Sequence, residues 1–176
     1  MKVFLKFVSI CLLASAFSCS PRISSGSAEA PGIICTDSVS RKFNLQLDFG
    51  KNHFSGMLIA RKMPGNEVRL LFTTYFGLSV FDLSLREGSL HVNSCVEPMR
   101  KKKMLSLLEK DLSALFLPGG NVRVKERRPG FEKRVSGGGI SKAVITVTQL
   151  PGEGGRQVRL KHPWIRLKMQ LDEIDI

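Results

Sequence analysis

The sequence has few of the residues from which catalytic and metal sites are built. Its 176 residues include 3 histidines and 4 cysteines, and His53, His91 and His162 lie far apart along the chain. It lacks the HExxH, GxSxG and phosphate-loop motifs, and no cysteine–histidine spacing is typical of zinc. We therefore expect no enzyme, no metal and no cofactor, and we interpret each histidine as a surface or rim residue.

Long apolar runs are missing as well, apart from a short one at the N-terminus. Two lysines precede the apolar run Phe7–Leu13, and small residues then lead to Cys19. This is the pattern of an export signal, and the run is too short to span a bilayer. Ala16–Cys19 resembles the lipobox of bacterial lipoproteins, which implies a signal peptide over residues 1–18 and a lipid anchor on Cys19. The alternative is an ordinary secreted protein that is cut near Cys19.

Cysteine is scarce enough to be assigned residue by residue. Cys11 leaves with the signal and Cys19 would carry lipid, so Cys35 and Cys95 remain. In an exported protein a single remaining pair predicts a disulfide, which would constrain the unfolded chain by about 4 kcal/mol. The alternative is a pair of free thiols, because the sequence does not show how far apart their Cα atoms are.

Acidic side chains are outnumbered, since Lys and Arg total 27 against 15 Asp and Glu, which gives a formal charge of +12. Loss of Lys2 and Lys6 with the signal would leave about +10. A strongly basic protein favours an acidic partner. Outside the cytoplasm the available anions are phospholipid head groups, lipopolysaccharide phosphates and acidic proteins, so the export signal argues against nucleic acid.

Two segments concentrate this positive charge. Arg100, Lys101, Lys102 and Lys103 lie where a helix is expected to begin, and there they would attract an anionic head group. The alternative is a solvated turn in front of a helix that begins near Met104. A second basic set would lie on one exposed strand face and its hairpin partner, where it would also protect a sheet edge from pairing: Arg123, Lys125, Arg127, Arg128, Lys133 and Arg134.

Apolar periodicity predicts a mainly β domain over residues 41–176 that follows a tether. Residues 19–40 begin with a stretch rich in Ser, Gly, Ala and Pro, and we interpret them as a flexible, lipid-anchored tether. Alternation with a period of two then predicts strands at residues 41–49, 54–62, 67–75, 78–85, 89–96, 122–128, 131–136, 143–150, 157–161 and 164–171. Together these strands favour a single curved antiparallel sheet.

Between the fifth and sixth of these strands the period changes to 3.6 residues. Apolar side chains of residues 104–116 form one stripe, which predicts one amphipathic helix against the sheet, while Ser106, Glu109, Lys110 and Asp111 point away from it. The inner face then has more aromatic and aliphatic mass than a one-sided sheet needs. The side chains concerned either line a cavity for acyl chains or fill a dry core: Phe72, Phe76, Phe81, Met104, Leu108, Leu112 and Phe116.

Three stretches resemble the family of LolB, the outer-membrane acceptor of the lipoprotein localisation pathway. They are Phe54–Ile59, Val68–Asp82 and the lysine-rich start of the leucine-patterned helix. The resemblance covers Arg41–Phe116 best, and its most specific part is the block Phe76–Asp82. It implies an unclosed antiparallel β-barrel of about nine to eleven strands with an α-helical lid, which encloses an apolar cavity for acyl chains.

Two features depart from that family. Its N-terminal helix has no counterpart in residues 20–31, and the turn at residues 63–66 is too short and polar for the protruding leucine loop with which family members hand lipoproteins to the membrane. We expect a lipid-anchored protein on the outer membrane, facing the periplasm, that binds acyl chains of lipid or lipoprotein. The alternative is an interaction lipoprotein with a filled core that docks an acidic protein partner.

Overall fold

The computed structural model describes residues 32–36, 39–119, 122–151 and 155–174. The predicted signal peptide and Cys19 lie outside these residues. Within the described residues there are ten strands: β1 Arg41–Phe49, β2 Asn52–Met63, β3 Glu67–Thr74, β4 Ser79–Arg86, β5 Ser89–Cys95, β6 Val122–Arg128, β7 Phe131–Ser136, β8 Ala143–Gln149, β9 Arg156–Lys161 and β10 Leu167–Ile174. The helix α2, Lys102–Phe116, follows β5.

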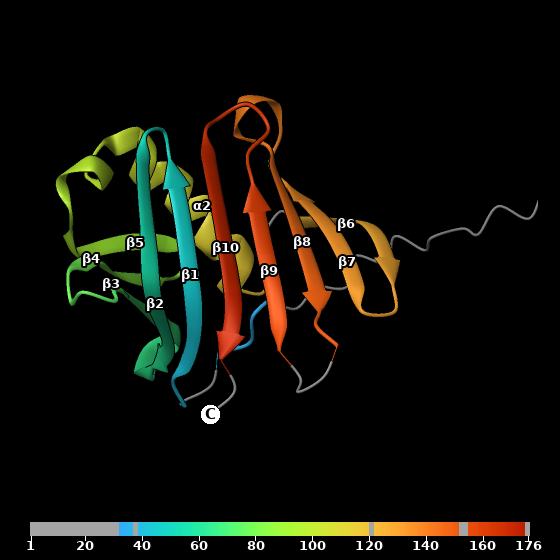
Figure 1. Ribbon diagram of the computed structural model, residues 1–176, viewed down its shortest axis with the longest axis horizontal. Coiled ribbons are helices and arrows are strands. Elements are labelled where there is room, and N and C mark those ends of the chain that lie inside the picture. Colours follow the sequence, from blue (N-terminus) through green and yellow to red (C-terminus); the bar gives the residue numbers. More distant parts are fainter. Residues whose placement is uncertain (1–31, 37–38, 120–121, 152–154, 175–176) are drawn as a thin grey trace, which may run out of the picture.

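Two meanders of five strands make up one antiparallel sheet (Figure 1). Hairpins join β1 to β5 in the first meander and β6 to β10 in the second, and α2 lies between them in the chain. The pairing of β1 with β10, in which Leu45 lies opposite Leu171, joins the meanders. In the described part of the chain the sheet runs β5-β4-β3-β2-β1-β10-β9-β8-β7-β6 and its two edges do not pair, which confirms the expected mainly β, unclosed barrel-like fold.

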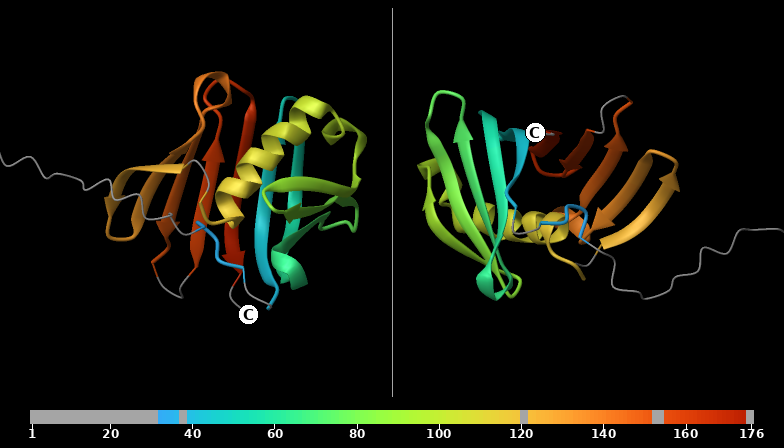
Figure 2. Two further views of the ribbon diagram at one scale, coloured as in Figure 1. Left: turned by 180° about the vertical axis from the view of Figure 1, so that it is seen from behind. Right: turned by 90° about the horizontal axis from the view of Figure 1, so that it is seen from below.

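The helix α2 lies across the concave side of this sheet (Figure 2). Among the strands, its backbone contacts β4 and β5 most. Alternate residues of the strands point toward it, as in β1, where Phe43, Leu45 and Leu47 are buried and the residues between them are more exposed. The apolar stripe of α2, with Met104, Leu108, Leu112, Leu115 and Phe116, packs with these side chains in one hydrophobic cluster.

Gly56 in β2 allows an unusually close approach of β3. A Cβ atom built at Gly56 would lie 2.0 Å from the carbonyl oxygen of Thr73, which no side chain could tolerate. Glycine inside a strand marks such approaches and strong local bending of a sheet. The first meander therefore depends on this one residue to curve around α2.

The structure moves the borders of two predicted elements. The helix begins at Lys102, two residues before Met104. The last strand begins at Leu167 and continues to Ile174, because residues 163–166 form a bend in which the Leu167 N–H donates to the Ile165 carbonyl. None of the helices in the described residues is long and apolar enough to cross a bilayer.

The end of the predicted tether is part of the fold. Ile33 and Ile34 are buried in the hydrophobic cluster, and the Ile34 N–H donates to the carbonyl of Leu115 at 2.8 Å. A guanidinium N–H of Arg156 donates to the Ile33 carbonyl at 2.9 Å. Folded structure therefore begins before Arg41, and these isoleucines hold the C-terminal end of α2.

Candidate functional site

Six of the seven residues predicted to bind acyl chains lie together under α2. Phe72, Phe81, Met104, Leu108, Leu112 and Phe116 are all buried in the one hydrophobic cluster. Phe72 and Phe81 are opposite each other on β3 and β4, with ring centroids 5.3 Å apart, and neither has exposed surface. A side chain without exposed surface does not border a void that admits water. Around these residues the interior is filled with side chains rather than hollow.

The seventh, Phe76, is in a different place from the one predicted. It lies in the turn between β3 and β4 with 99% of its surface exposed, and its neighbours Tyr75 and Leu78 are also exposed. The prediction failed because Phe76 continues an apolar pattern, whereas the strand ends at Thr74 and the turn projects the ring away from the sheet. We call residues 75–78 the apolar turn.

The apolar turn is well held. The Thr74 N–H donates to the Leu78 carbonyl at 2.8 Å, and the Leu78 N–H donates to the Thr74 hydroxyl at 3.1 Å. Gly77 has a φ of 83°, which glycine adopts without strain, and the Tyr75 hydroxyl donates to the Asn44 side-chain oxygen at 2.8 Å. These bonds fix the backbone, so the exposure of Phe76 is a built feature of the turn.

A buried histidine–carboxylate pair ties α2 to the loop between β9 and β10. The Nε2 atom of His162 lies 2.8 Å from Oδ2 and 3.0 Å from Oδ1 of Asp111, and the two side chains are 1% and 2% exposed. Both were misjudged from the sequence, since His162 is not a rim residue and Asp111 does not point away. Asp111 lies three residues from Leu108 and four from Leu115, so its place on the apolar stripe was the signal.

Burial and hydrogen bonding act on the Asp111 carboxyl in opposite directions. Burial raises the pKa of Asp111, and the hydrogen bond from His162 acts in the opposite direction. A cleft of about 400 Å³ opens beside it, between α2 and the β4–β5 and β7–β8 turns, with Asp111, Ser113, Gly88 and Ser141 in its lining. The pair thus adds a polar attachment of α2 to the apolar packing of its other buried side chains.

The expected disulfide is not formed, because Cys35 and Cys95 are free thiols, the first exposed and the second buried. Cys35 follows Ile34, which is bonded to Leu115 near the end of α2, whereas the Cys95 carbonyl accepts from Arg100 just before α2 begins. The 15 residues of α2 span about 22 Å, and a disulfide needs Cα atoms within about 7 Å. The thiols are therefore separated by the length of the helix.

The basic segment Arg100–Lys103 lies at the N-terminal end of α2. Lys101 is the N-cap without a side-chain cap, and Lys102 and Lys103 are exposed in the first turn. Arg100 donates to the Cys95 carbonyl at 3.2 Å and lies 3.7 Å from Glu97 in an exposed pair. Cations in a first turn oppose the helix dipole at a cost of roughly 0.3–1 kcal/mol each. Binding of an anionic head group there stays a prediction.

The second basic set lies on the edge hairpin β6–β7. Glu132 lies 3.1 Å from Arg127 and 2.7 Å from Arg134, and Arg128 contacts Glu126. Arg123 and Lys125 are exposed on β6, which is an edge strand of the sheet. Charged side chains on an edge prevent pairing with another sheet, so this position fits the protective role considered from the sequence.

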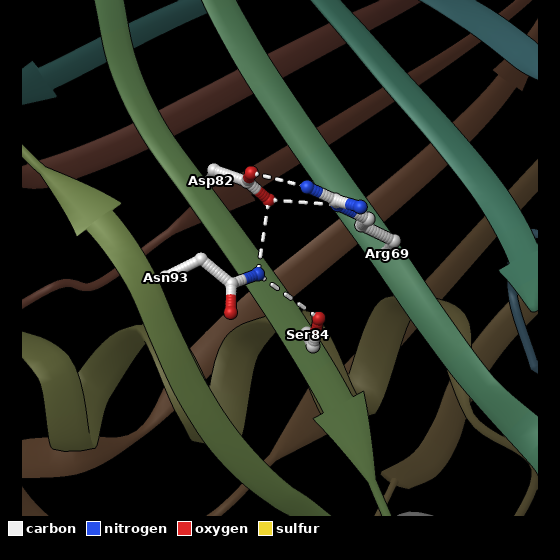
Figure 3. Close-up of polar contacts among 4 residues, drawn as sticks. All are labelled: Arg69, Asp82, Ser84 and Asn93. Atoms are coloured by element: carbon white, nitrogen blue, oxygen red, sulfur yellow. Dashed lines mark hydrogen bonds and ion pairs between the residues drawn. The ribbon is translucent and has the colours of Figure 1, made fainter.

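A polar network covers the outer face of β3, β4 and β5 (Figure 3). Arg69 donates to both carboxylate oxygens of Asp82, at 3.1 and 2.7 Å, and the Asn93 amide donates to Asp82 and to the Ser84 hydroxyl. The hydrogen bonds from Arg69 lower the pKa of Asp82. Nearby, Arg86 and Glu67 lie 2.7 Å apart. Each cation here has an acid beside it, so the network neutralises itself.

Neither a protein-family model nor a curated protein matches the chain. The geometry of the fold and of the residues under α2 therefore carries the functional argument.

Proposed function

We propose that this protein is a lipid-anchored, non-enzymatic carrier or acceptor of acyl chains in the bacterial envelope, facing the periplasm from the outer membrane. One observation carries the proposal: the large apolar side chains on the concave face of an open sheet are covered by a single amphipathic helix. Acyl chains would leave water favourably if they took the place of α2 against these side chains. The export signal and Cys19 would supply the anchor.

In this proposal the structure is the closed state. Phe72, Phe81 and Leu112 have no exposed surface, so acyl chains enter only when α2 moves away from the sheet. The polar tie between Asp111 and His162, with the cleft beside it, is the attachment that α2 would have to give up when it moves. Each CH₂ of an acyl chain that replaces a helix side chain restores about 0.8 kcal/mol of apolar burial.

The apolar turn supports the same function from outside the core. A soluble domain rarely projects three large apolar side chains from one ordered turn unless they contact a membrane or another apolar partner. The role that the resemblance assigns to a protruding leucine loop would fall to Phe76 and Leu78 in this chain. In this proposal the apolar turn enters the bilayer interface during transfer.

Bound lipid is the direct test. Native mass spectrometry of the full chain, purified from cell envelopes, is expected to show acyl-chain adducts. Asp111→Asn weakens the tie on α2 and should increase their occupancy, whereas Lys110→Asn, at an exposed neighbouring position, should not. Chains free of lipid in both the wild type and Asp111→Asn would contradict the carrier.

The apolar turn is tested by transfer. Phe76→Ser should slow the transfer of a fluorescent acyl cargo to acceptor vesicles several-fold without lowering stability. Ile140→Ser is the matched control, because Ile140 is 74% exposed in another turn. Equal transfer by both variants would remove the turn from the function.

The second candidate function is an interaction lipoprotein that docks an acidic protein partner. The sealed packing of Phe72, Phe81 and Leu112 favours it, since a filled core needs no ligand. It predicts that the amides of α2 exchange hydrogen as slowly as those of β1 and β10, and that no lipid is bound. Faster exchange confined to α2 would support the carrier instead.

A further inference from the structure

The outer face of the sheet has a groove that the acyl-chain proposal does not use. It has a volume of about 530 Å³ and crosses β1, β10, β9 and β8 on the side opposite α2, which is the side toward the viewer in Figure 1. Arg159, Lys161 and Lys168 supply its cations, and Val144 and Pro163 supply apolar surface. A cationic groove with apolar walls fits an amphipathic anion.

Two lysines of this groove lie opposite each other on paired strands, although like charges at such positions destabilise a sheet. Lys161 lies directly opposite Lys168 on the antiparallel pair β9–β10, where like charges disfavour pairing. Neither lysine has an ion-pair partner among the described residues, and Arg159 donates to the uncharged oxygen of Gln170 at 3.1 Å.

One acid lies in the groove and a second lies near it, and both accept hydrogen bonds from neighbouring side chains. Asp48 itself lines the groove and is opposite Lys168 in the β1–β10 register, and its carboxylate lies 2.5 Å from Nδ1 of His53. Asp172 accepts hydrogen bonds from the Gln157 and Gln170 amides. Three cations and one carboxylate thus line the groove, which leaves an excess of positive charge that an external anion would neutralise.

An exposed tryptophan follows a residue of the groove in the sequence and indicates the kind of surface that would bring the anion. Pro163 lines the groove, and the next residue, Trp164, is 75% exposed. The loop is anchored at His162. The His162 side chain is buried against Asp111, and the His162 backbone N–H donates to the Leu167 carbonyl. Tryptophan favours the head-group layer of membranes, where its ring is apolar and its N–H is hydrated.

We propose that this outer face docks on an anionic bilayer, with the phosphate of an anionic phospholipid in the groove between Lys161 and Lys168 and with Trp164 in the head-group layer. The surface is separate from the acyl-chain space under α2, so either proposal stands without the other. Docking through it would leave α2, on the opposite side of the sheet, free to open.

The chain carries its own probe for this proposal, because Trp164 is its single tryptophan. The full chain is reconstituted at equal protein-to-lipid ratio in vesicles of phosphatidylcholine and in vesicles that also contain phosphatidylglycerol. We expect the emission of Trp164 to shift to shorter wavelength only in the anionic vesicles, and the shift to disappear at high salt. An emission that is the same in both vesicles would overturn the proposal.

Matched variants separate the groove from general positive charge. Lys161→Gln with Lys168→Gln should weaken the response by about fivefold for each lysine removed. Lys62→Gln with Lys110→Gln removes the same charge from exposed positions elsewhere and should leave the response unchanged. Equal weakening by the two double variants would overturn the assignment to the groove. Protection of Lys161 and Lys168 from acetylation by inorganic phosphate, without any vesicle response, would overturn the lipid assignment.

The melting temperature completes the test. The Lys161→Gln, Lys168→Gln protein should melt no lower than the wild type, because the variant relieves the opposition of two like charges. A lower melting temperature would show that the lysines support the fold, and the proposal would then fail.

Discussion

The two halves of the sheet that flank the central pair β1–β10 are built differently. In the first half, β2–β5, the interior holds the aromatic pair Phe72 and Phe81, and outside it Arg69 and Asp82 neutralise each other. In the second half, β6–β9, the interior of β8 and β9 is aliphatic. The outer face concentrates Arg159 and Lys161 of β9 next to Lys168 of β10.

The attachment of α2 follows the same division. Toward the first half its backbone contacts β4 and β5, and toward the second half it is tied by Asp111 and His162. Apolar packing is non-directional and cooperative, whereas a buried polar pair is a single attachment that is lost as a unit. The two sides of the interior therefore differ in this polar attachment, while apolar side chains of both pack with α2.

The largest effect is expected at the bend of the first half. Gly56→Ala would place a Cβ atom against the Thr73 carbonyl, so β3 would have to move, and we expect a loss of about 4 kcal/mol in the free energy of unfolding. Gly138→Ala in the second half is the control, because a Cβ atom there has nothing within 4 Å. Urea titration followed by circular dichroism measures both, and similar midpoints would refute the special role of Gly56.

The next effect concerns the attachment of α2 to the second half. Asp111→Ala would leave His162 buried without its partner, and we expect a loss of about 3 kcal/mol. Lys110→Ala, next to it on the exposed side of α2, should stay within about 0.5 kcal/mol of the wild type. If Asp111→Ala is as stable as the control, α2 is held by packing alone, and the two sides of the interior do not differ in this respect.

Local pattern was sufficient to predict the strands and the helix. In β1 the alternation of Phe43, Leu45 and Leu47 with polar residues is enough, because one face of the strand meets the core. The pattern misplaced the start of β10, since Ile165 continues the alternation of Leu167 and Met169 although the backbone bends before Leu167.

The site depended on contacts that local pattern does not contain. His162 is buried by a carboxylate 51 positions away, and no window of the sequence includes both. Phe76 has the same side chain as Phe72, but one lies in a turn and the other in a strand. The opposition of Lys161 and Lys168 requires the register of β9 and β10. The sequence therefore indicates which segments are apolar or basic. Which of these side chains contact each other depends on the strand register and the long-range fold.

A moderate effect is expected on the outer face of the first half. Asp82→Ala would remove the acceptor of both Arg69 hydrogen bonds and of the Asn93 amide, and we expect a loss of about 1.5 kcal/mol. Because Arg69 lowers the pKa of Asp82, the stabilisation is present above the ordinary carboxyl range and is lost as the pH falls through the lowered pKa. Thermal melts from neutral to acidic pH should therefore converge for the two proteins at low pH. A constant gap would show that the charge of Asp82 is not what stabilises the network.

The smallest expected effect is a gain in the free energy of unfolding rather than a loss. It compares the charged outer face around Lys168 directly with the neutralised outer face of the first half. Lys168→Gln would remove one of two like charges that lie opposite each other on β9 and β10, so we expect a gain of about 0.5 kcal/mol in the free energy of unfolding. The gain should shrink in high salt, which screens exposed charges. A loss of stability would mean that Asp48, opposite Lys168 on β1, already neutralises it as Asp82 neutralises Arg69. Removal of a charge would then weaken both halves, and the outer face of the second half would have no unbalanced charge for an anion to neutralise.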